Sequence, residues 1–136
     1  MTASRSALAT RLTTYDRLLE VGIGRRPEVA AALVDADCAV TAIDVFDAPV
    51  PDGVDFVRDD VVTRRNDLDD SDPPYRVDAV YGLNLPAELQ RPARDVARAA
   101  DADFLFTTLG FEEPVIPVDR ETVGGETLYV APRRRR

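Results

Sequence analysis

The stretch Leu19-Glu20-Val21-Gly22-Ile23-Gly24-Arg25-Arg26-Pro27 indicates the fold of this chain. An apolar strand ends in Gly-x-Gly, and a helix is expected to start at Pro27, because proline is favoured in the first turn of a helix. Gly22 permits a tight turn, and Gly24 lets the backbone approach a ligand closely. The pattern therefore predicts a strand-turn-helix unit whose helix N-terminus suits an anionic group.

Outward from this loop, strand and helix patterns alternate along the chain. Such alternation predicts a doubly wound, mostly parallel sheet covered by helices. Strands are expected at residues 17–21, 38–44, 54–58, 78–81 and 104–108. Helices are expected at residues 4–15, from Pro27 onward, and through the apolar stripe from Leu89 to Ala100. Residues 59–76, rich in Asp, are expected to form a solvated connection or a short helix.

The C-terminal part has a different pattern. Residues 118–123 and 126–130 flank Gly124-Gly125, which predicts an antiparallel hairpin with a two-residue turn. The expected fold is a three-layer α/β/α Rossmann-like domain with this hairpin at its C-terminal end. We expect one domain over residues 1–132, followed by a disordered arginine tail at residues 133–136.

The composition is acidic and lacks two residue types. All 17 basic residues are Arg, 25 residues are acidic, and the net charge is -8. Excess Asp without Lys is typical of the cytosol of an extreme halophile, where a strongly anionic surface keeps the protein soluble. The alternative is an ordinary acidic protein encoded by a GC-rich genome.

The missing residue types exclude several kinds of site. Without His, no His-based triad, general base or metal site exists. Without Lys, a phosphate-binding P-loop lysine and a Schiff base are excluded. Cys38 alone forms neither an internal disulfide nor a multi-Cys zinc site, so no metal is expected. No apolar run approaches the roughly 20 residues of a membrane span, and no signal peptide is visible, which favours a cytoplasmic protein.

Asp44 ends the second expected strand, 20 residues after Gly24. A carboxylate at this position can accept hydrogen bonds from the two hydroxyls of a ribose. A dinucleotide-binding loop would carry its third glycine where this chain has Pro27. The alternative is a glycine-containing turn that binds nothing, with Asp44 as a turn residue.

Glu20, Gly22 and Gly24 together resemble the acidic-x-Gly-x-Gly motif of class I S-adenosylmethionine (SAM) methyltransferases. In that family the loop lies under the cofactor, so the resemblance implies that Asp44 holds the ribose hydroxyls. It also implies that Asp60-Val61 meets the adenine amino group. The family's third glycine falls at Arg26.

The end of the fourth strand offers a further resemblance. Asn84 and Pro86 are similar to the Asn-Pro-Pro motif that faces the acceptor in amino-methylating enzymes, although Leu85 and Ala87 depart from it. The alternative, favoured by helix chemistry, is that Asn84 caps the next helix and Pro86 lies in its first turn.

The whole layout resembles a small archaeal family of uncharacterised proteins with a methyltransferase-type core. The resemblance rests on residues 20–24, Asp44, Asp60-Val61 and residues 86–90. It implies a protein that binds SAM or a related adenosine ligand and, if it is an enzyme, transfers a methyl group to an unidentified acceptor. Asp or Tyr81 would then have to accept the acceptor's proton.

Two alternatives remain open from the sequence: a non-catalytic Rossmann-like protein-interaction domain, and a small NAD(P)-binding module. A small nucleoside-type ligand is the expected partner, and no membrane partner is expected. Nucleic acid is not favoured, because molar salt removes most of the counterion-release gain of arginine-phosphate contacts. The oligomeric state is left open.

Overall fold

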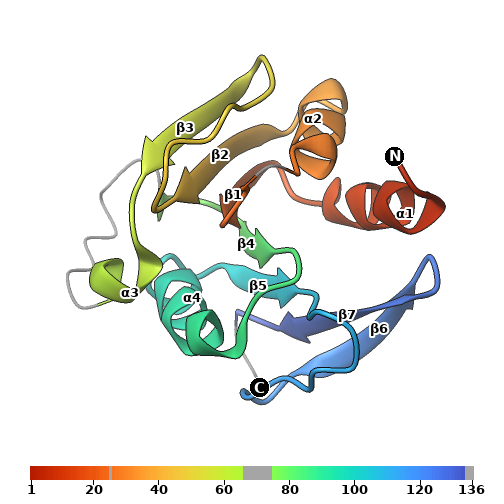
Figure 1. Ribbon diagram of the computed structural model, residues 1–136, viewed down its shortest axis with the longest axis vertical. Coiled ribbons are helices and arrows are strands. Elements are labelled where there is room, and N and C mark those ends of the chain that lie inside the picture. Colours follow the sequence, from red (N-terminus) through yellow and green to blue (C-terminus); the bar gives the residue numbers. More distant parts are fainter. Residues whose placement is uncertain (25, 66–74, 134–136) are drawn as a thin grey trace.

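Seven strands form one sheet in the computed structural model, which describes residues 1–24, 26–65 and 75–133 (Figure 1). The strands are β1 (Arg17–Val21), β2 (Ala39–Asp44), β3 (Val54–Arg58), β4 (Ala79–Gly82), β5 (Asp103–Phe106), β6 (Asp119–Val123) and β7 (Glu126–Ala131). The helices are α1 (Ala3–Leu12), α2 (Glu28–Asp35), α3 (Val61–Arg64) and α4 (Ala87–Ala99).

The sheet has the strand order β3-β2-β1-β4-β5-β7-β6. Strands β1 to β5 run parallel, β7 is antiparallel to β5, and β6 is antiparallel to β7. At the centre, Leu18 of β1 pairs with Val40 on one side and with Ala79 on the other. The predicted fold class, a mostly parallel sheet with a C-terminal antiparallel hairpin, is therefore confirmed.

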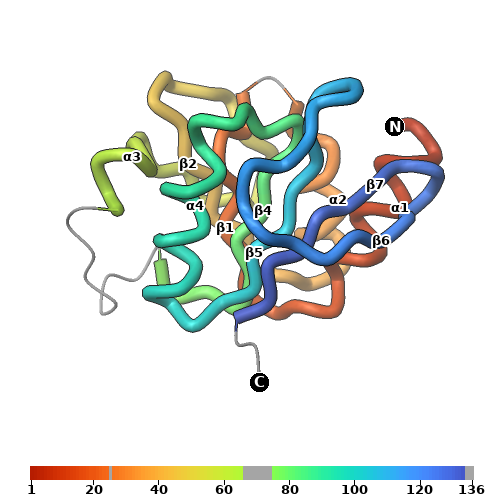
Figure 2. The backbone as a smooth tube through the Cα atoms, turned by 90° about the horizontal axis from the view of Figure 1, so that it is seen from below, coloured from red at the N-terminus to blue at the C-terminus, as the bar shows by residue number. Residues whose placement is uncertain are grey.

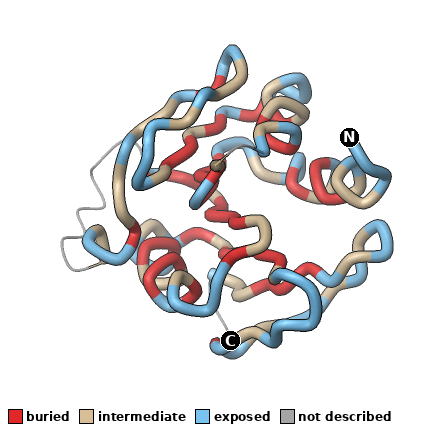
Figure 3. Tube along the Cα trace, in the orientation of Figure 1, coloured by how far each residue is buried: buried red, intermediate tan, exposed pale blue. Residues whose placement is uncertain are grey.

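Helices cover both faces of the sheet. Figure 1 shows α1 and α2 on one side and α3 and α4 on the other. Successive β1 residues alternate between the two layers: Leu18 packs in the cluster that contains α1 and α2, and Leu19 packs in the cluster that contains α4. Phe104 and Phe106 stack in the second cluster with ring centroids 5.0 Å apart. Figure 3 shows the buried residues concentrated in the central strands and the helix faces that cover them.

Most expected elements lie within a few residues of their predicted positions. The first helix ends at Leu12 rather than residue 15, with Thr13 at its C-cap. In the acidic connection, α3 forms over four residues, and residues 66–74 lie outside the described residues. The two-residue hairpin turn is confirmed: Gly124 and Gly125 join the paired residues Val123 and Glu126, and both have positive φ, at +59° and +82°, as a type I′ turn requires.

The chain end only partly lies within the described residues. Arg133 donates its backbone N–H to Asp103 Oδ1 over 2.8 Å, and residues 134–136 lie outside the described part. Between Met1 and Arg133, excluding residues 25 and 66–74, no helix is long and apolar enough to cross a bilayer.

The carboxyl ends of the parallel strands share one edge of the sheet. Figure 2 shows the loops that follow β1, β2 and β5 along this edge, at the top of the view. Residues 45–53, between β2 and β3, and residues 107–118, between β5 and β6, contain no helix. Ligands of doubly wound sheets bind beyond the carboxyl ends of the strands, so these short connections shape the candidate site.

Candidate functional site

The glycine loop makes its tight turn through two left-handed residues. Gly22 has φ +74° and Gly24 has φ +54°, a region that residues with a Cβ rarely adopt. The Gly22 N–H donates to the Ile43 carbonyl over 2.9 Å, which ties the end of β1 to the end of β2. A Cβ added at either glycine would meet no atom within 4 Å. The glycines are therefore needed for the backbone conformation, and the loop faces open space.

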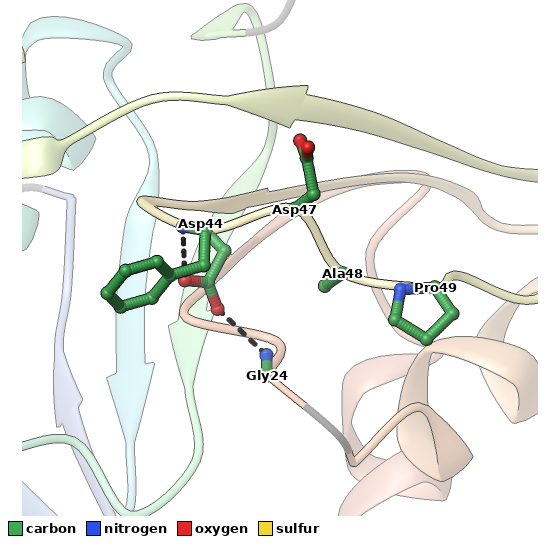
Figure 4. Close-up of a pocket in the computed structure, with 6 residues that line it drawn as sticks. Gly24, Asp44, Asp47, Ala48 and Pro49 are labelled. Carbon is green, nitrogen blue, oxygen red and sulfur yellow. Dashed lines mark hydrogen bonds between the residues drawn. The ribbon is translucent and has the colours of Figure 1, made fainter.

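Asp44 connects this loop to the neighbouring strand. Its Oδ2 accepts a hydrogen bond from the Gly24 N–H over 2.9 Å, and its Oδ1 accepts one from the Phe46 N–H over 3.1 Å (Figure 4). Each oxygen of a carboxylate can accept a second hydrogen bond, so Asp44 retains capacity for a ligand hydroxyl. The side chain thus both stabilises the loop and presents acceptors at its surface.

Asp44 borders two cavities. The larger, about 350 Å³, is lined by Gly24, Asp44 and the first residues of the β2–β3 connection: Phe46, Asp47, Ala48 and Pro49. The smaller, about 80 Å³, has mainly apolar walls and an acidic rim; its lining residues are Val21, Gly22, Ile43, Asp44, Val45, Asp59, Asp60, Val61 and Leu89. Five of the seven predicted site residues therefore surround these cavities.

The acidic rim of the smaller cavity has a defined structure. Asp60 caps α3, because its Oδ1 accepts a hydrogen bond from the Val62 N–H over 2.9 Å. Asp59 Oδ2 accepts hydrogen bonds from Arg64 Nε over 3.1 Å and from the Tyr75 hydroxyl. Burial opposes ionisation of Asp59, but the hydrogen bonds from Tyr75, Asp60 and Arg64 outweigh it and hold its pKa below the ordinary value.

Glu20 belongs to β1, just before the glycine loop, and lines neither cavity. It is 1% exposed, and its Oε1 accepts a hydrogen bond from the Tyr81 hydroxyl over 2.5 Å. Burial raises the pKa of Glu20 to about 7, against the opposing effects of the Tyr81 hydrogen bond and the Arg5 charge. Burial also raises the pKa of Tyr81 well above its ordinary value, so this hydroxyl is a poor candidate for a proton acceptor.

Asn84 lines a third cavity, about 440 Å³, with Thr108, Phe111 and Tyr129 among its neighbours. Its φ is +51°, and its backbone N–H donates to Thr107 Oγ1 over 2.8 Å. The prediction that Asn84 caps the following helix is wrong. Helix α4 begins at Ala87, and Pro86 occupies the cap position without a side-chain capping bond. The strand-end turn, closed by Thr107, keeps Asn84 away from that cap.

Sequence reasoning missed two parts of the site. Residues 46–49 lie between two predicted strands, and no local signal marks them as the wall of a cavity. Asp59 was missed in favour of Asp60, although both line the smaller cavity. The Asp59-Asp60 pair itself was the available signal, because either carboxylate at a strand end can face the same edge.

Residues 3–134 match a family described as Uncharacterised protein family (UPF0146). The chain belongs to UPF0146. Two UPF0146 proteins from strains of Halobacterium salinarum are each 48% identical to it over 129 residues, which covers 91% of this chain and 93% of theirs. The predicted resemblance to a small haloarchaeal family of uncharacterised proteins is confirmed.

Solved structures similar to this UPF0146 chain include methyltransferases. A Burkholderia thailandensis 1,6-didemethyltoxoflavin-N1-methyltransferase, solved with S-adenosylhomocysteine (SAH), has a TM-score of 0.54 at 19% identity, covering 95% of this chain and 59% of that one. The N-terminal domain of EvdMO1, also with SAH bound, has a TM-score of 0.55 at 17% identity, covering 89% of this chain and 57% of that one. The UPF0146 fold thus resembles that of SAM-dependent methyltransferases, while the chain spans under three-fifths of these two proteins.

Proposed function

We propose that this UPF0146 protein binds SAM or SAH at the carboxyl edge of its sheet. The observation that carries the proposal is the position of Asp44, at the end of β2, against the left-handed glycine loop and between two cavities. The ribose hydroxyls would donate to the Asp44 carboxylate. Because Asp44 borders both cavities, this contact is available whichever cavity receives the base.

The chemical character of the smaller cavity suits an adenine ring. Its apolar walls include Val21, Ile43 and Leu89, and Asp60 offers an acceptor to an exocyclic amine. The volume of about 80 Å³ is much smaller than that of the neighbouring cavity, so entry of the ring requires the surrounding loops to widen. Phe46, which is 73% exposed beside the larger cavity, has room to move.

Methyl transfer would be compatible with this set of residues. SAM supplies a methyl group on an already activated sulfonium, so the protein's main task is to position donor and acceptor. The absence of His and Lys is therefore no obstacle. The acceptor itself is unidentified, and the buried Tyr81 is unsuited to receive its proton.

Calorimetric titration in molar KCl with SAM, SAH and NAD tests the proposal. We expect SAM and SAH to bind the natural chain, and Asp44→Ala to weaken both by at least about tenfold, or ~1.4 kcal/mol. Asp55→Ala is the matched control, because Asp55 is an exposed aspartate on β3 that lines neither Asp44 cavity. A thermal melt of each variant checks that the loss of two Asp44 hydrogen bonds leaves the fold intact.

Two outcomes would overturn the proposal. Binding of NAD alone would indicate a dinucleotide-binding module. No heat from any ligand would favour the second candidate, a non-catalytic interaction domain. That candidate is supported by Leu109 and Phe111, which are 61% and 103% exposed in the loop after β5.

A further inference from the structure

A cavity of about 380 Å³ lies at the amino edge of the sheet. Figure 2 shows this edge at the bottom of the view, opposite the loops that follow β1, β2 and β5. Arg17, the first residue of β1, lines the amino-edge cavity, whereas Val21, the last residue of β1, lines the smaller Asp44 cavity. A strand rises about 3.3 Å per residue, so these two Cα atoms lie roughly 13 Å apart. The amino-edge cavity is therefore separate from the proposed SAM site.

Three arginines from distant parts of the chain meet at this cavity. Arg17 begins β1, Arg76 lies just before β4, and Arg133 follows β7. They come together because β1, β4, β5 and β7 are successive strands of the sheet. The lining includes only two acidic residues, which leaves a local excess of one positive charge in a chain whose net charge is -8. The full lining is Arg17, Arg76, Val77, Asp78, Ala99, Ala100, Asp101 and Arg133.

The guanidinium groups of Arg17 and Arg76 are available to a ligand. Both residues are exposed, and neither side chain has a hydrogen bond or ion pair within residues 1–24, 26–65 and 75–133. The Asp78 carboxylate accepts from the backbone N–H of Arg17 over 3.0 Å rather than from its guanidinium. Positive charges gathered at one cavity repel one another, so an anion bound between them would be favoured.

Arg133 is held at the cavity by bonds to the starts of β4 and β5. Its backbone N–H donates to Asp103 Oδ1 over 2.8 Å, and its Nη2 donates to the Asp78 carbonyl over 3.3 Å. The Arg133 Nε also lies 3.5 Å from Asp103 Oδ1. A guanidinium carries several N–H donors, so Arg133 keeps donors for a ligand. One cationic group is therefore positioned before a ligand arrives, which lowers the ordering cost of binding.

The number of guanidinium groups favours a terminal phosphoryl group over other anions. Such a group carries up to about two negative charges and three acceptor oxygens, which matches three arginines. A carboxylate offers only two oxygens, and a phosphodiester of a nucleic-acid backbone has two free oxygens and a single charge. The forked donors of arginine also contact phosphate oxygens in pairs, through short charge-assisted hydrogen bonds. The cavity volume exceeds by more than ten times the roughly 30 Å³ that one water molecule occupies, so it has room for such a group.

We propose that the amino-edge cavity binds the terminal phosphoryl group of a small phosphorylated molecule, held by Arg17, Arg76 and Arg133. This ligand differs in chemical class from SAM, and its site lies at the opposite edge of the sheet. The inference therefore does not depend on the proposed function.

Calorimetric titration with inorganic diphosphate in molar KCl tests the proposal. The salt screens charges beyond roughly 3 Å, so binding reports direct contacts rather than distant charge. Malonate, a dicarboxylate, and an oligouridylate without a terminal phosphate are titrated in parallel. Arg17→Gln and Arg76→Gln remove no side-chain hydrogen bond of the described residues. Arg26→Gln is the matched control, because Arg26 is also exposed but lies outside this cavity, before α2.

We expect the natural chain to bind diphosphate. Arg17→Gln and Arg76→Gln should each weaken this binding at least about tenfold, through loss of charge-assisted hydrogen bonds. Arg26→Gln should leave the affinity unchanged. No binding by the natural chain, or an equal loss in Arg26→Gln, would overturn the proposal. Tighter binding of malonate or of the oligouridylate than of diphosphate would also overturn it, because the ligand would then not be a terminal phosphoryl group.

The arginines at positions 134–136 are tested separately. They follow Arg133 in the sequence and lie outside the described residues. A full-length chain with all three replaced by glutamine should still bind diphosphate, and Arg17→Gln should still weaken that binding. Loss of binding in this chain, with Arg17→Gln and Arg76→Gln alone having no effect, would assign the anion to the chain end and overturn the cavity site.

Discussion

The Glu20 carboxyl shows how one residue can control the pH dependence of stability. Its charged and titratable neighbours come from three elements: Tyr81 on β4, Arg5 on α1 and Glu28 on α2. Burial raises its pKa from 4.5 to about 7, so the folded protein binds a proton that the unfolded chain has already released. Its contribution to stability is therefore fully present below about pH 4.5 and is lost as the pH rises through about 7.

We predict that Glu20→Gln removes this loss. The amide oxygen still accepts the Tyr81 hydrogen bond, but no charge forms in the buried site. The natural chain should lose on the order of 3 kcal/mol of unfolding free energy between about pH 5 and pH 8, and the variant should not. Denaturant unfolding of both proteins across this range measures the difference. Parallel pH curves would contradict the assignment. Three other carboxyls have lowered pKa values, so their contributions to stability are lost only as the pH falls below this range. These are Asp59, Asp103 and Glu121.

At the scale of elements, an ion pair links α1 to the hairpin formed by β6 and β7. Arg11 donates from Nε and Nη2 to the two carboxylate oxygens of Glu121, over 2.9 and 3.1 Å. The hairpin tip also packs against α1, because a Cβ added to Gly124 would lie 2.6 Å from the Ala7 Cβ and 3.0 Å from the Ser4 Cα. A Cβ at Gly125 would meet nothing within 4 Å.

These two glycines form a matched pair for a stability test. Both have positive φ, so alanine at either costs roughly 1–2 kcal/mol through the backbone. We predict that Gly124→Ala destabilises by at least about 1 kcal/mol more than Gly125→Ala, since only the first forces the hairpin away from α1. Thermal or denaturant unfolding gives both values. Equal destabilisation would show that α1 and the hairpin tip separate at little cost.

At the scale of the whole molecule, the decisive property is the negative net charge. A net charge of -8 on 136 residues favours solubility but opposes the compact state through self-repulsion. Raising KCl from about 0.1 M to about 1 M shortens the Debye length from roughly 10 Å to 3 Å. We predict that the melting temperature rises by several degrees over this range. A variant with Asp52→Asn and Asp55→Asn, both exposed, should show a smaller rise. An identical salt dependence would indicate that general salt effects, rather than charge repulsion, are responsible.

Much of the architecture could be predicted because its signals are local. The signals of the apolar run at residues 38–44, of the Gly22 and Gly24 turn and of the Gly124-Gly125 hairpin each lie within a few neighbouring residues. The candidate site was harder to predict because the residues that form it come from different elements of the fold. The error at Asn84 illustrates this: a good capping residue in sequence is drawn into a turn closed by Thr107, 23 residues away. The length of α3 and the wall at residues 46–49 had no comparable local signal.

The amino-acid sequence by itself determined the order of strands and helices along the chain and the glycines of the left-handed turns. It also excluded sites that need His or Lys. Each of these features depends only on residue type and short-range periodicity. Only the tertiary structure decided that Asp44 bonds to Gly24, that Glu20 is buried against Tyr81, and that Arg17 and Arg76 line one cavity. These features depend on which elements pack together and how far water is excluded between them. A carboxylate or guanidinium acquires its partners and its pKa from that packing, which no single segment of the chain contains.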